Sequence, residues 1–193
     1  TNNWTGPFYG FERAIESYEL TDKPYRFKPI DIYYHSYIVS KTASLNSLHK
    51  VYQWALKQPV FPVYSSEYIE KVLDFNDFVI ARTPEGYRFR GNGDLKTVRW
   101  TDEKNHINFA DSPQVAGFNR YNGQNYVHLL NSNADLVTQS ANNTLPYVES
   151  TNARINRFVR SKNTLDLSLT AYQPISITFA NASKCQLIQG SKT

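Results

Sequence analysis

The segment GYRFRGNGDLKTVRW (residues 86–100) decides the fold of most of this chain. On both sides of the central GNGD, apolar residues alternate with basic ones, which is the pattern of a strand with one face toward a core and one toward solvent. GNGD has the composition of a turn, because Asn, Gly and Asp tolerate the backbone angles that a tight turn requires. The segment therefore predicts two short strands separated by a turn.

The same alternation continues through residues 76–193, where helical periodicity is almost absent. Within YNGQ (121–124), the Asn-Gly pair predicts a type I′ hairpin turn. Eight or nine short strands at turn-like intervals favour an antiparallel β-sandwich for this part of the chain. The segments that read as strands are 78–82, 86–91, 95–100, 115–118, 125–130, 135–139, 154–160, 164–170 and 174–180.

Residues 1–75 show a different pattern, in which strand-like and helix-like segments alternate. The segments PIDIYYHSY (29–37) and VFPVY (60–64) are rich in β-branched and aromatic residues and read as strands. Helices are predicted over 41–58 and 66–73. A helix-length crossover between two strands implies a parallel pair, which is typical of α/β sheets and barrels. The expected fold class is therefore α+β, with a short βαβα segment followed by an antiparallel β-sandwich.

The two predicted helices have recognisable boundaries. The apolar side chains of the first recur at three- and four-residue steps, as on one face of a helix. Ser40 or Thr42 is expected to cap its N-terminus, and Pro59 to end it. Ser65 or Ser66 is the expected N-cap of the second helix. The expected boundary between the two parts of the chain lies between residues 75 and 76.

Composition narrows the classes of partner. Hydrophobic residues make up 40% of the chain and charged residues 20%, as in an ordinary folded domain. The net charge is +4, but Lys and Arg are spread along the strands instead of clustered, so we expect no nucleic-acid partner. No apolar run reaches the roughly 18–20 residues of a membrane helix, so no membrane span is expected. The chain contains no Met, and we infer a processed protein or a piece of a longer one.

Few residues have a pattern that indicates chemistry. No two of the four histidines are three to five residues apart, so no metal site is expected within this chain. Cys185 is the only cysteine, which excludes an intrachain disulfide. His35 lies near the end of the first predicted strand, and catalytic groups of α/β enzymes lie at such ends. From the residues alone, His35 is either a catalytic group or an aromatic filler of a core.

A resemblance bears on this choice. A strand ending in His35, a helix, a short strand and then SSEYIEKVL resemble the closing segment of the polysaccharide deacetylase (NodB-like) barrel. The segments TGPFYGFERAIESYEL and PIDIYYHSYIVSKTASL, with GYRFRGNGDLKTVRW and VAGFNRYNGQNYVHL, are similar to the C-terminal part of the Pel exopolysaccharide deacetylase family. The resemblance runs through most of the chain, and YYHSY with GPFYGFE is its strongest part.

The resemblance implies a function for the parent protein. That function is metal-dependent de-N-acetylation of an exopolysaccharide in the periplasm. His35 matches the family's late-strand histidine, which acts as a general acid toward the leaving amine. The family's base and the ligands of its divalent, zinc-like metal lie on earlier strands, and no residues of this chain match them. The chain is therefore expected to be inactive alone and to bind no catalytic metal.

The second part of the chain is a candidate carbohydrate-binding domain. Aromatic rings stack on sugar C–H groups, and amides satisfy sugar hydroxyls. The stretch NRYNGQNY (119–126) combines both, and the expected contacts with a polysaccharide are Trp100, Tyr121, Asn122, Asn125 and Tyr126. A second interpretation is a structural or partner-binding module that docks another component of an exopolysaccharide secretion complex. A third, a complete small enzyme, is disfavoured because His, Asp and Glu are not clustered.

Overall fold

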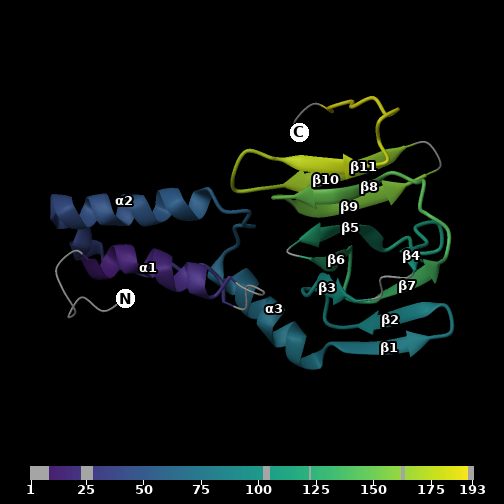
Figure 1. The fold of residues 1–193 in the computed structure, drawn as a ribbon, viewed down its shortest axis with the longest axis horizontal. Helices are drawn as coiled ribbons and strands as arrows, with labels where there is room; N and C mark the ends of the chain where they lie inside the picture. Colours follow the sequence, from purple (N-terminus) through teal and green to yellow (C-terminus); the bar gives the residue numbers. More distant parts are fainter. Residues whose placement is uncertain (1–8, 23–27, 102–104, 122, 162–163, 191–193) are drawn as a thin grey trace. The chain divides into compact units, whose positions relative to one another are not determined.

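The computed structural model of the chain describes residues 9–22, 28–101, 105–121, 123–161 and 164–190, and Figure 1 shows their fold. The chain divides into two compact units, Thr1–Val60 and Phe61–Thr193. The expected boundary lay at residue 75, whereas the structure groups residues 61–75 with the strands. Mixed helices and antiparallel sheets make the fold α+β, as the sequence predicted.

The first unit is built on two packed helices, α1 (Tyr9–Leu20) and α2 (Thr42–Leu56). The ring of Tyr18 stacks on Trp54 with 5.8 Å between centroids, and Lys50 Nζ lies 2.8 Å from a carboxylate oxygen of Glu12. The helix predicted over 41–58 is confirmed as α2. Its N-cap is Lys41, without a side-chain hydrogen bond, so the expected caps at Ser40 and Thr42 were wrong.

The strands predicted over 29–37 and 60–64 do not form. Residues 29–35 and 60–64 have no strand assignment, and Ser36–Ser40 form a short 3-10 helix, η2, in which Ile38 N–H donates to the His35 carbonyl at 3.0 Å. β-branched and aromatic residues favour extended backbone, but a strand also needs a neighbour that accepts and donates its hydrogen bonds. Among the described residues these segments pair with no strand, so the parallel βαβα pairing was wrong.

The second unit begins with α3 (Ser65–Asp77), which confirms the helix predicted over 66–73. Its N-cap is Tyr64, whose backbone N–H donates to Glu67 Oε2 at 2.8 Å. The expected caps at Ser65 and Ser66 are instead the first two helical residues. None of the three α-helices in the described part of the chain has both the length and the apolar composition needed to cross a lipid bilayer.

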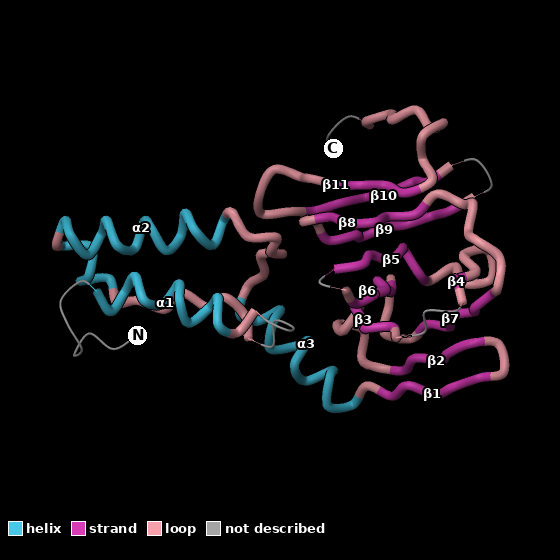
Figure 2. The backbone as a smooth tube through the Cα atoms, in the orientation of Figure 1, coloured by secondary structure: helices cyan, strands magenta, loops and turns pink. Residues whose placement is uncertain are grey.

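Eleven strands follow α3 within the described residues, and each strand pair that they form is antiparallel. Figure 2 shows the strands in magenta. A four-stranded sheet has the order β1-β2-β7-β4, a three-stranded sheet the order β3-β6-β5, and two pairs are β10-β9 and β11-β8. The strands are β1 (Val79–Thr83), β2 (Gly86–Arg90), β3 (Thr97–Trp100), β4 (His106–Ile107), β5 (Val115–Tyr121), β6 (Gln124–Leu129), β7 (Ala134–Gln139), β8 (Tyr147–Thr151), β9 (Arg154–Arg160), β10 (Leu165–Thr170) and β11 (Ile177–Ala180).

All nine strands predicted within residues 76–193 are confirmed, and the sequence missed β4 and β8. The hairpin predicted at YNGQ joins β5 to β6, where Tyr121 pairs with Gln124 and Gly123 has a φ of 76°. Asn122 of this turn lies outside the described residues. A positive φ is readily adopted by Gly, which explains why the Asn-Gly pair located this turn.

The main core of the second unit joins its two larger sheets. Phe89 and Leu136 of the four-stranded sheet and Val127 and Leu129 of the three-stranded sheet belong to one buried cluster. These two sheets therefore pack against each other through apolar side chains that alternate along their strands. A second cluster joins Ala116 of β5 to the strand pairs β10-β9 and β11-β8.

Candidate functional site

A cavity of about 400 Å³ opens in the second unit beside the three-stranded sheet. Its wall includes side chains of α3, the loop before β3, and strands β3, β5, β6, β8 and β9. We call this cavity the β-unit pocket and define it by Lys71, Lys96, Asn119, Tyr126, His128 and Arg154. All of these residues lie within Phe61–Thr193, so the pocket belongs to one unit.

Strand geometry explains which side chains reach the pocket. Successive residues of a strand point to opposite faces of the sheet. On β6, Val127 and Leu129 point into the main core and are fully buried, whereas Tyr126 and His128 line the pocket. Across the ladder, Thr97 of β3 pairs with His128. The three-stranded sheet therefore has one apolar face toward the core and one mixed face toward the pocket.

His128 forms part of the pocket wall in its neutral state. Its Nδ1 lies 3.1 Å from Thr97 Oγ1, a hydrogen-bonding distance. Burial, with a smaller contribution from the positive charges of Lys96 and Lys71, lowers the pKa of His128 from 6.5 to about 4. The imidazole is therefore uncharged at neutral pH, and it offers a ligand a hydrogen-bonding group without a charge.

Basic side chains dominate the charge around His128. Burial lowers the pKa of Lys96, and Lys71 and Arg154 add to this effect. Lys71 Nζ donates to the backbone carbonyl of Asp94 at 2.9 Å. Arg154 forms an ion pair with Glu67 of α3. The pocket thus combines ammonium groups, a neutral imidazole, hydroxyl and amide groups, and the aromatic rings of Tyr126 and Phe61.

The five predicted sugar contacts lie in different environments. Tyr126 lines the pocket. Trp100 is 8% exposed and belongs to the main core, so its ring has no free face for a ligand, and its indole N–H has no partner among the described residues. Tyr121 is 43% exposed at the end of the β5–β6 hairpin and is not a lining residue of the pocket. Asn125 is not a lining residue, and Asn122 lies outside the described residues.

Sequence reasoning missed most of the pocket. The stretch 119–126 supplies Asn119 and Tyr126, but Lys71, Lys96 and Arg154 come from distant segments. His128 was not among the predicted site residues, and it lies in β6. The signal that could have placed it was the period of two, which puts His128 on the same face as Tyr126.

His35 lies in the first unit, at the start of the 3-10 helix η2, with an extended backbone. Its exposed ring stacks on Tyr37 at 5.1 Å between centroids and meets the edge of Tyr33 at 5.3 Å. Among the described residues its imidazole has no hydrogen bond or ion pair. The exposed rings of Tyr33, His35 and Tyr37 therefore lie against one another. The catalytic role of His35 stays a prediction.

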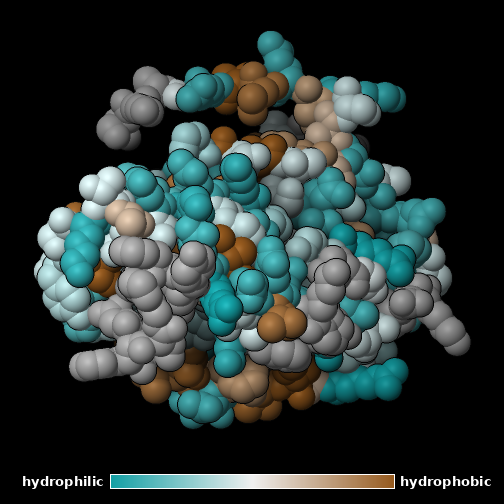
Figure 3. Space-filling view, turned by 60° about the vertical axis from the view of Figure 1, so that its left-hand side comes forward, coloured by the Kyte–Doolittle hydropathy of each residue, from teal (hydrophilic) through white to brown (hydrophobic). Residues whose placement is uncertain are grey.

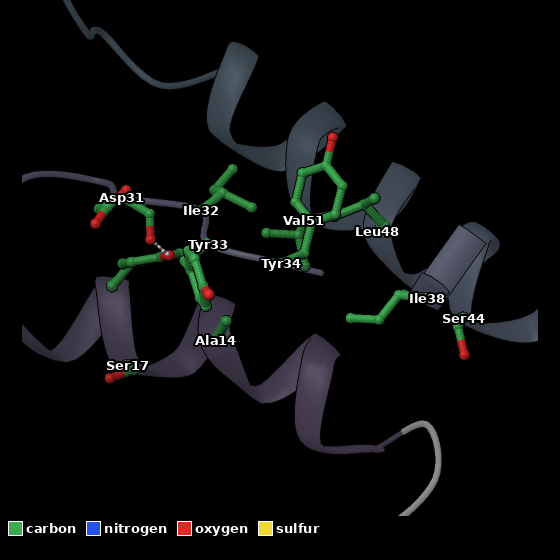
Figure 4. A pocket seen from close by; sticks show the side chains of 11 residues that line it. Ala14, Ser17, Asp31, Ile32, Tyr33, Tyr34, Ile38, Ser44, Leu48 and Val51 are labelled. Atoms are coloured by element: carbon green, nitrogen blue, oxygen red, sulfur yellow. Dashed lines mark hydrogen bonds between the residues drawn. The ribbon is translucent and has the colours of Figure 1, made fainter. Parts of the chain in front are cut away.

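A second cavity, of about 250 Å³, lies in the first unit between α1, α2 and the segment 31–34 (Figure 4). Figure 4 shows Ile32, Tyr34 and Val51 among the side chains around it. The hydroxyl of Tyr18 donates to the backbone carbonyl of Asp31, which fixes the segment against α1. The lining is mainly apolar and aromatic, and it contains no basic residue.

Among the described residues, no group of three or more His, Cys, Asp or Glu side chains is close enough together to hold a metal ion. The residues of the described part of this chain therefore do not fit the divalent ion that the resemblance implies for the parent, and no catalytic step through a metal is derived.

Comparisons with known proteins add no relative to this description. No model of a protein family matches the chain, no curated protein matches its sequence, and no solved structure matches it. The interpretation of the pocket therefore depends on its own residues and on the sequence resemblance described above.

Proposed function

We propose that this chain is the C-terminal part of an exopolysaccharide de-N-acetylase and that residues 61–193 are its saccharide-binding module. The observation that carries the proposal is that Asn119 and Tyr126, the two ends of the predicted contact stretch, both line the β-unit pocket. The resemblance of the quoted segments to the Pel exopolysaccharide deacetylase family supports the parent activity and a periplasmic location.

The pocket has the properties expected of a small saccharide site. Ligand pockets have volumes of roughly 300–1,000 Å³ and combine apolar walls with a few polar groups. Here Tyr126 and the exposed ring of Phe61 supply aromatic surface for sugar C–H groups. Asn119, Thr97 and Thr151 supply amide and hydroxyl groups that can pair with sugar hydroxyls.

Titration of the purified chain with N-acetylated oligosaccharides tests this proposal. We expect saturable binding by isothermal titration calorimetry, weakened about tenfold by Tyr126→Ala, because stacking of one ring contributes on the order of 1 kcal/mol or more. Tyr121→Ala is the matched control, since Tyr121 is the other tyrosine of the same hairpin, is exposed, and does not line the pocket. If no oligosaccharide binds, or if both variants lose the same amount of affinity, residues 61–193 are not a saccharide-binding module of the proposed kind.

The catalytic half of the proposal concerns His35. In the parent, His35 would protonate the leaving amine. We expect the chain alone to release no acetate from an acetylated oligosaccharide with added zinc or cobalt. Release at a rate typical of a complete deacetylase would show that this chain holds its own metal site and would overturn the proposal.

A partner-binding module is the second candidate function, and one observation favours it. Figure 3 shows hydrophobic residues in brown among hydrophilic ones on one face of the molecule. In the second unit, large exposed apolar side chains gather on α3 and β1. They are Ile69, Val72, Leu73, Phe75, Val79 and Ile80.

Glutamate substitutions on this surface distinguish partner binding from saccharide binding. The double variant Leu73→Glu, Ile80→Glu would abolish co-purification with another component of a secretion complex if the surface docks that component. Its affinity for saccharides would stay unchanged, because neither residue lines the β-unit pocket. Co-purification that survives both substitutions would exclude this surface as the docking site.

A further inference from the structure

A smaller cavity, of about 100 Å³, adjoins the β-unit pocket. Its wall includes the start of β9, the end of β10 and the segment before α3, and we call it the β9–β10 cavity. Phe61 and Arg154 line both this cavity and the β-unit pocket, so the two cavities meet at these side chains. All lining residues of both cavities lie within Phe61–Thr193 and therefore belong to one unit.

The side chains at the junction of the two cavities reach the surface. Phe61 is exposed, and so is the side chain of Arg154. A ligand in the β-unit pocket can therefore extend past both side chains into the β9–β10 cavity without entering the protein interior. A linear polymer needs such an open path, whereas a single sugar residue does not.

Glu67 fixes the position of Arg154 at this junction. One carboxylate oxygen of Glu67, Oε1, forms the ion pair with Arg154, and the other, Oε2, accepts the backbone N–H of Tyr64 at 2.8 Å. The carboxylate thus holds the guanidinium against the first turn of α3. Within the described part of the chain, the side-chain contacts of Arg154 use only Nη2, so its other N–H groups can donate to sugar hydroxyls.

The β9–β10 cavity has an aromatic wall of its own. The ring of Tyr172 lines this cavity and is 52% exposed. Tyr64, which is also exposed, meets this ring edge to face with 4.9 Å between the centroids. Such a contact orients Tyr172 and leaves ring surface free to stack on sugar C–H groups. Asn156 and Thr170, joined by a 2.7 Å hydrogen bond, place amide and hydroxyl oxygens in the same wall.

We propose that the β-unit pocket and the β9–β10 cavity are two subsites of one extended saccharide-binding site, each of which holds a different sugar residue of the same polymer. Tyr126 stacks on one residue and Tyr172 on the other, and Arg154 donates to hydroxyl groups between them. This inference rests on the proposed saccharide-binding function and adds that the ligand is a chain of at least two sugar residues.

A site with two subsites favours a polymer over free sugars. Each sugar residue that makes contact adds binding free energy, whereas the loss of translational and rotational freedom is incurred once for the whole ligand. Affinity should therefore rise between a ligand that fills one subsite and a ligand that fills both. A module with this property would stay bound to its polymer in the presence of free sugar residues.

N-acetylated chitooligosaccharides of one, two, four and six residues test the inference. NMR titration of the purified chain measures their affinities, including the weak binding of the shortest probe. We expect the four-residue probe to bind at least tenfold tighter than the one-residue probe, because the shorter probe can occupy only one subsite at a time.

Substitutions of Tyr172 locate the second subsite. Tyr172→Ala should lower the affinity for the four-residue probe about tenfold and leave that for the one-residue probe within about twofold, because the β-unit pocket stays intact. Tyr172→Phe keeps the ring and should retain the wild-type affinity for both probes. Tyr121→Ala is the matched control, since Tyr121 is exposed in the same unit and lines neither cavity.

The outcomes distinguish the inference from the function on which it rests. Equal affinity for probes of all lengths would overturn the extended site, while saccharide binding would stand. If Tyr172→Ala leaves the four-residue probe unaffected, or weakens both probes equally, the β9–β10 cavity is not a second subsite. If none of the probes binds, the saccharide-binding function fails and the inference fails with it.

Discussion

The hydroxyl of Ser132 donates a 2.7 Å hydrogen bond to Oδ2 of Asp74, and both side chains are almost completely buried. Asp74 lies in α3, and Ser132 follows β6. The same carboxylate accepts backbone N–H donors of Asn92, Asp94 and Leu95. One buried charge thus links α3 to the loop before β3 and to the segment after β6. This linkage explains why α3 belongs to the second unit.

Asp74→Asn should lower the free energy of unfolding at pH 7 by about 3 kcal/mol, because an amide group cannot accept all of these hydrogen bonds and places its own donor against backbone donors. Urea denaturation of the two proteins measures the difference. Asp77→Asn is the control, since Asp77 is exposed on the same helix and should cost less than about 0.5 kcal/mol. Equal effects at both positions would show that Asp74 has no special role.

The same carboxylate predicts an acid transition. Burial raises the pKa of Asp74, but hydrogen bonds from Leu95, Asn92, Ser132 and Asp94 outweigh it and lower the pKa from 3.8 to about 2. Because the folded-state pKa is the lower one, this stabilisation, about 2 kcal/mol, is complete above pH 4 to 5 and is lost as the pH falls through 2. The free energy of unfolding of Asp74→Asn should therefore fall less at low pH than that of the wild type. An equally steep fall in both proteins would show that the Asp74 carboxylate does not cause it.

Arg160 of β9 lies where both cores of the second unit meet. Its guanidinium carbon is 4.4 Å from the centroid of the Phe109 ring. Its nitrogens donate to the backbone carbonyls of Pro146, Val115 and Ala116 at 3.0–3.2 Å. A planar group with several donors in fixed directions can make this set of contacts, whereas an ammonium group cannot.

Arg160→Lys should therefore reduce the free energy of unfolding by about 2 kcal/mol, although the charge is kept. Arg157→Lys is the matched control on the same strand, because Arg157 is exposed and forms a surface ion pair with Asp166. We expect that control to change stability by less than about 0.5 kcal/mol. If thermal or urea unfolding shows the two substitutions to be equivalent, the contacts of Arg160 contribute nothing specific.

The strands of the second unit could be predicted because their pattern is local. In TLDLSLT (164–170), Leu165, Leu167 and Leu169 alternate with polar residues, and β10 covers Leu165–Thr170. β4 has only two residues, which is too short for alternation to appear. β8 contains one fully apolar aliphatic side chain, Val148, among polar ones, and it gains its strand structure from pairing with β11. Pairing of this kind depends on residues distant in sequence.

The site was less predictable for the same reason. The sequence indicated the stretch 119–126, but the lysines of the pocket arrive from other elements, which no local pattern reveals. Trp100 was a predicted contact, and the period of two along β3 would have placed it with Val98 on the core face. The strand predicted at 29–37 was wrong because amino-acid composition indicates only how readily a backbone becomes extended. It does not indicate whether another strand lies beside it to form hydrogen bonds.

Gly117 of β5 provides a steric test of the contact between β5 and β8. A Cβ at this position would lie 1.9 Å from the carbonyl oxygen of Val148. Gly117→Ala should therefore cost about 3 kcal/mol or more, because backbone atoms must move apart. Gly190→Ala is the control, since no atom lies within 4 Å of a Cβ there. A melting temperature unchanged by Gly117→Ala would show that β5 and β8 are farther apart than described.

His128 predicts a pH dependence in a different range from that of Asp74. Its pKa is lowered from 6.5 to about 4, chiefly by burial, so the unfolded chain takes up a proton at a higher pH than the folded one. The stabilisation that follows is complete above about pH 7, decreases as the pH falls, and is lost at about pH 4, up to roughly 3 kcal/mol. Stability measured by urea between pH 7.5 and 4.5 should therefore decline while Asp74 stays ionised.

His128→Gln should flatten this decline, because glutamine keeps a hydrogen-bonding group near Thr97 but does not titrate. His49→Gln is the matched substitution at an exposed histidine, on α2 of the first unit. NMR titration of the wild-type ring gives an independent measurement, since its proton shifts should stay constant down to about pH 5. A ring that titrates near its ordinary pKa would mean that the pocket wall is solvated and would contradict the burial of His128.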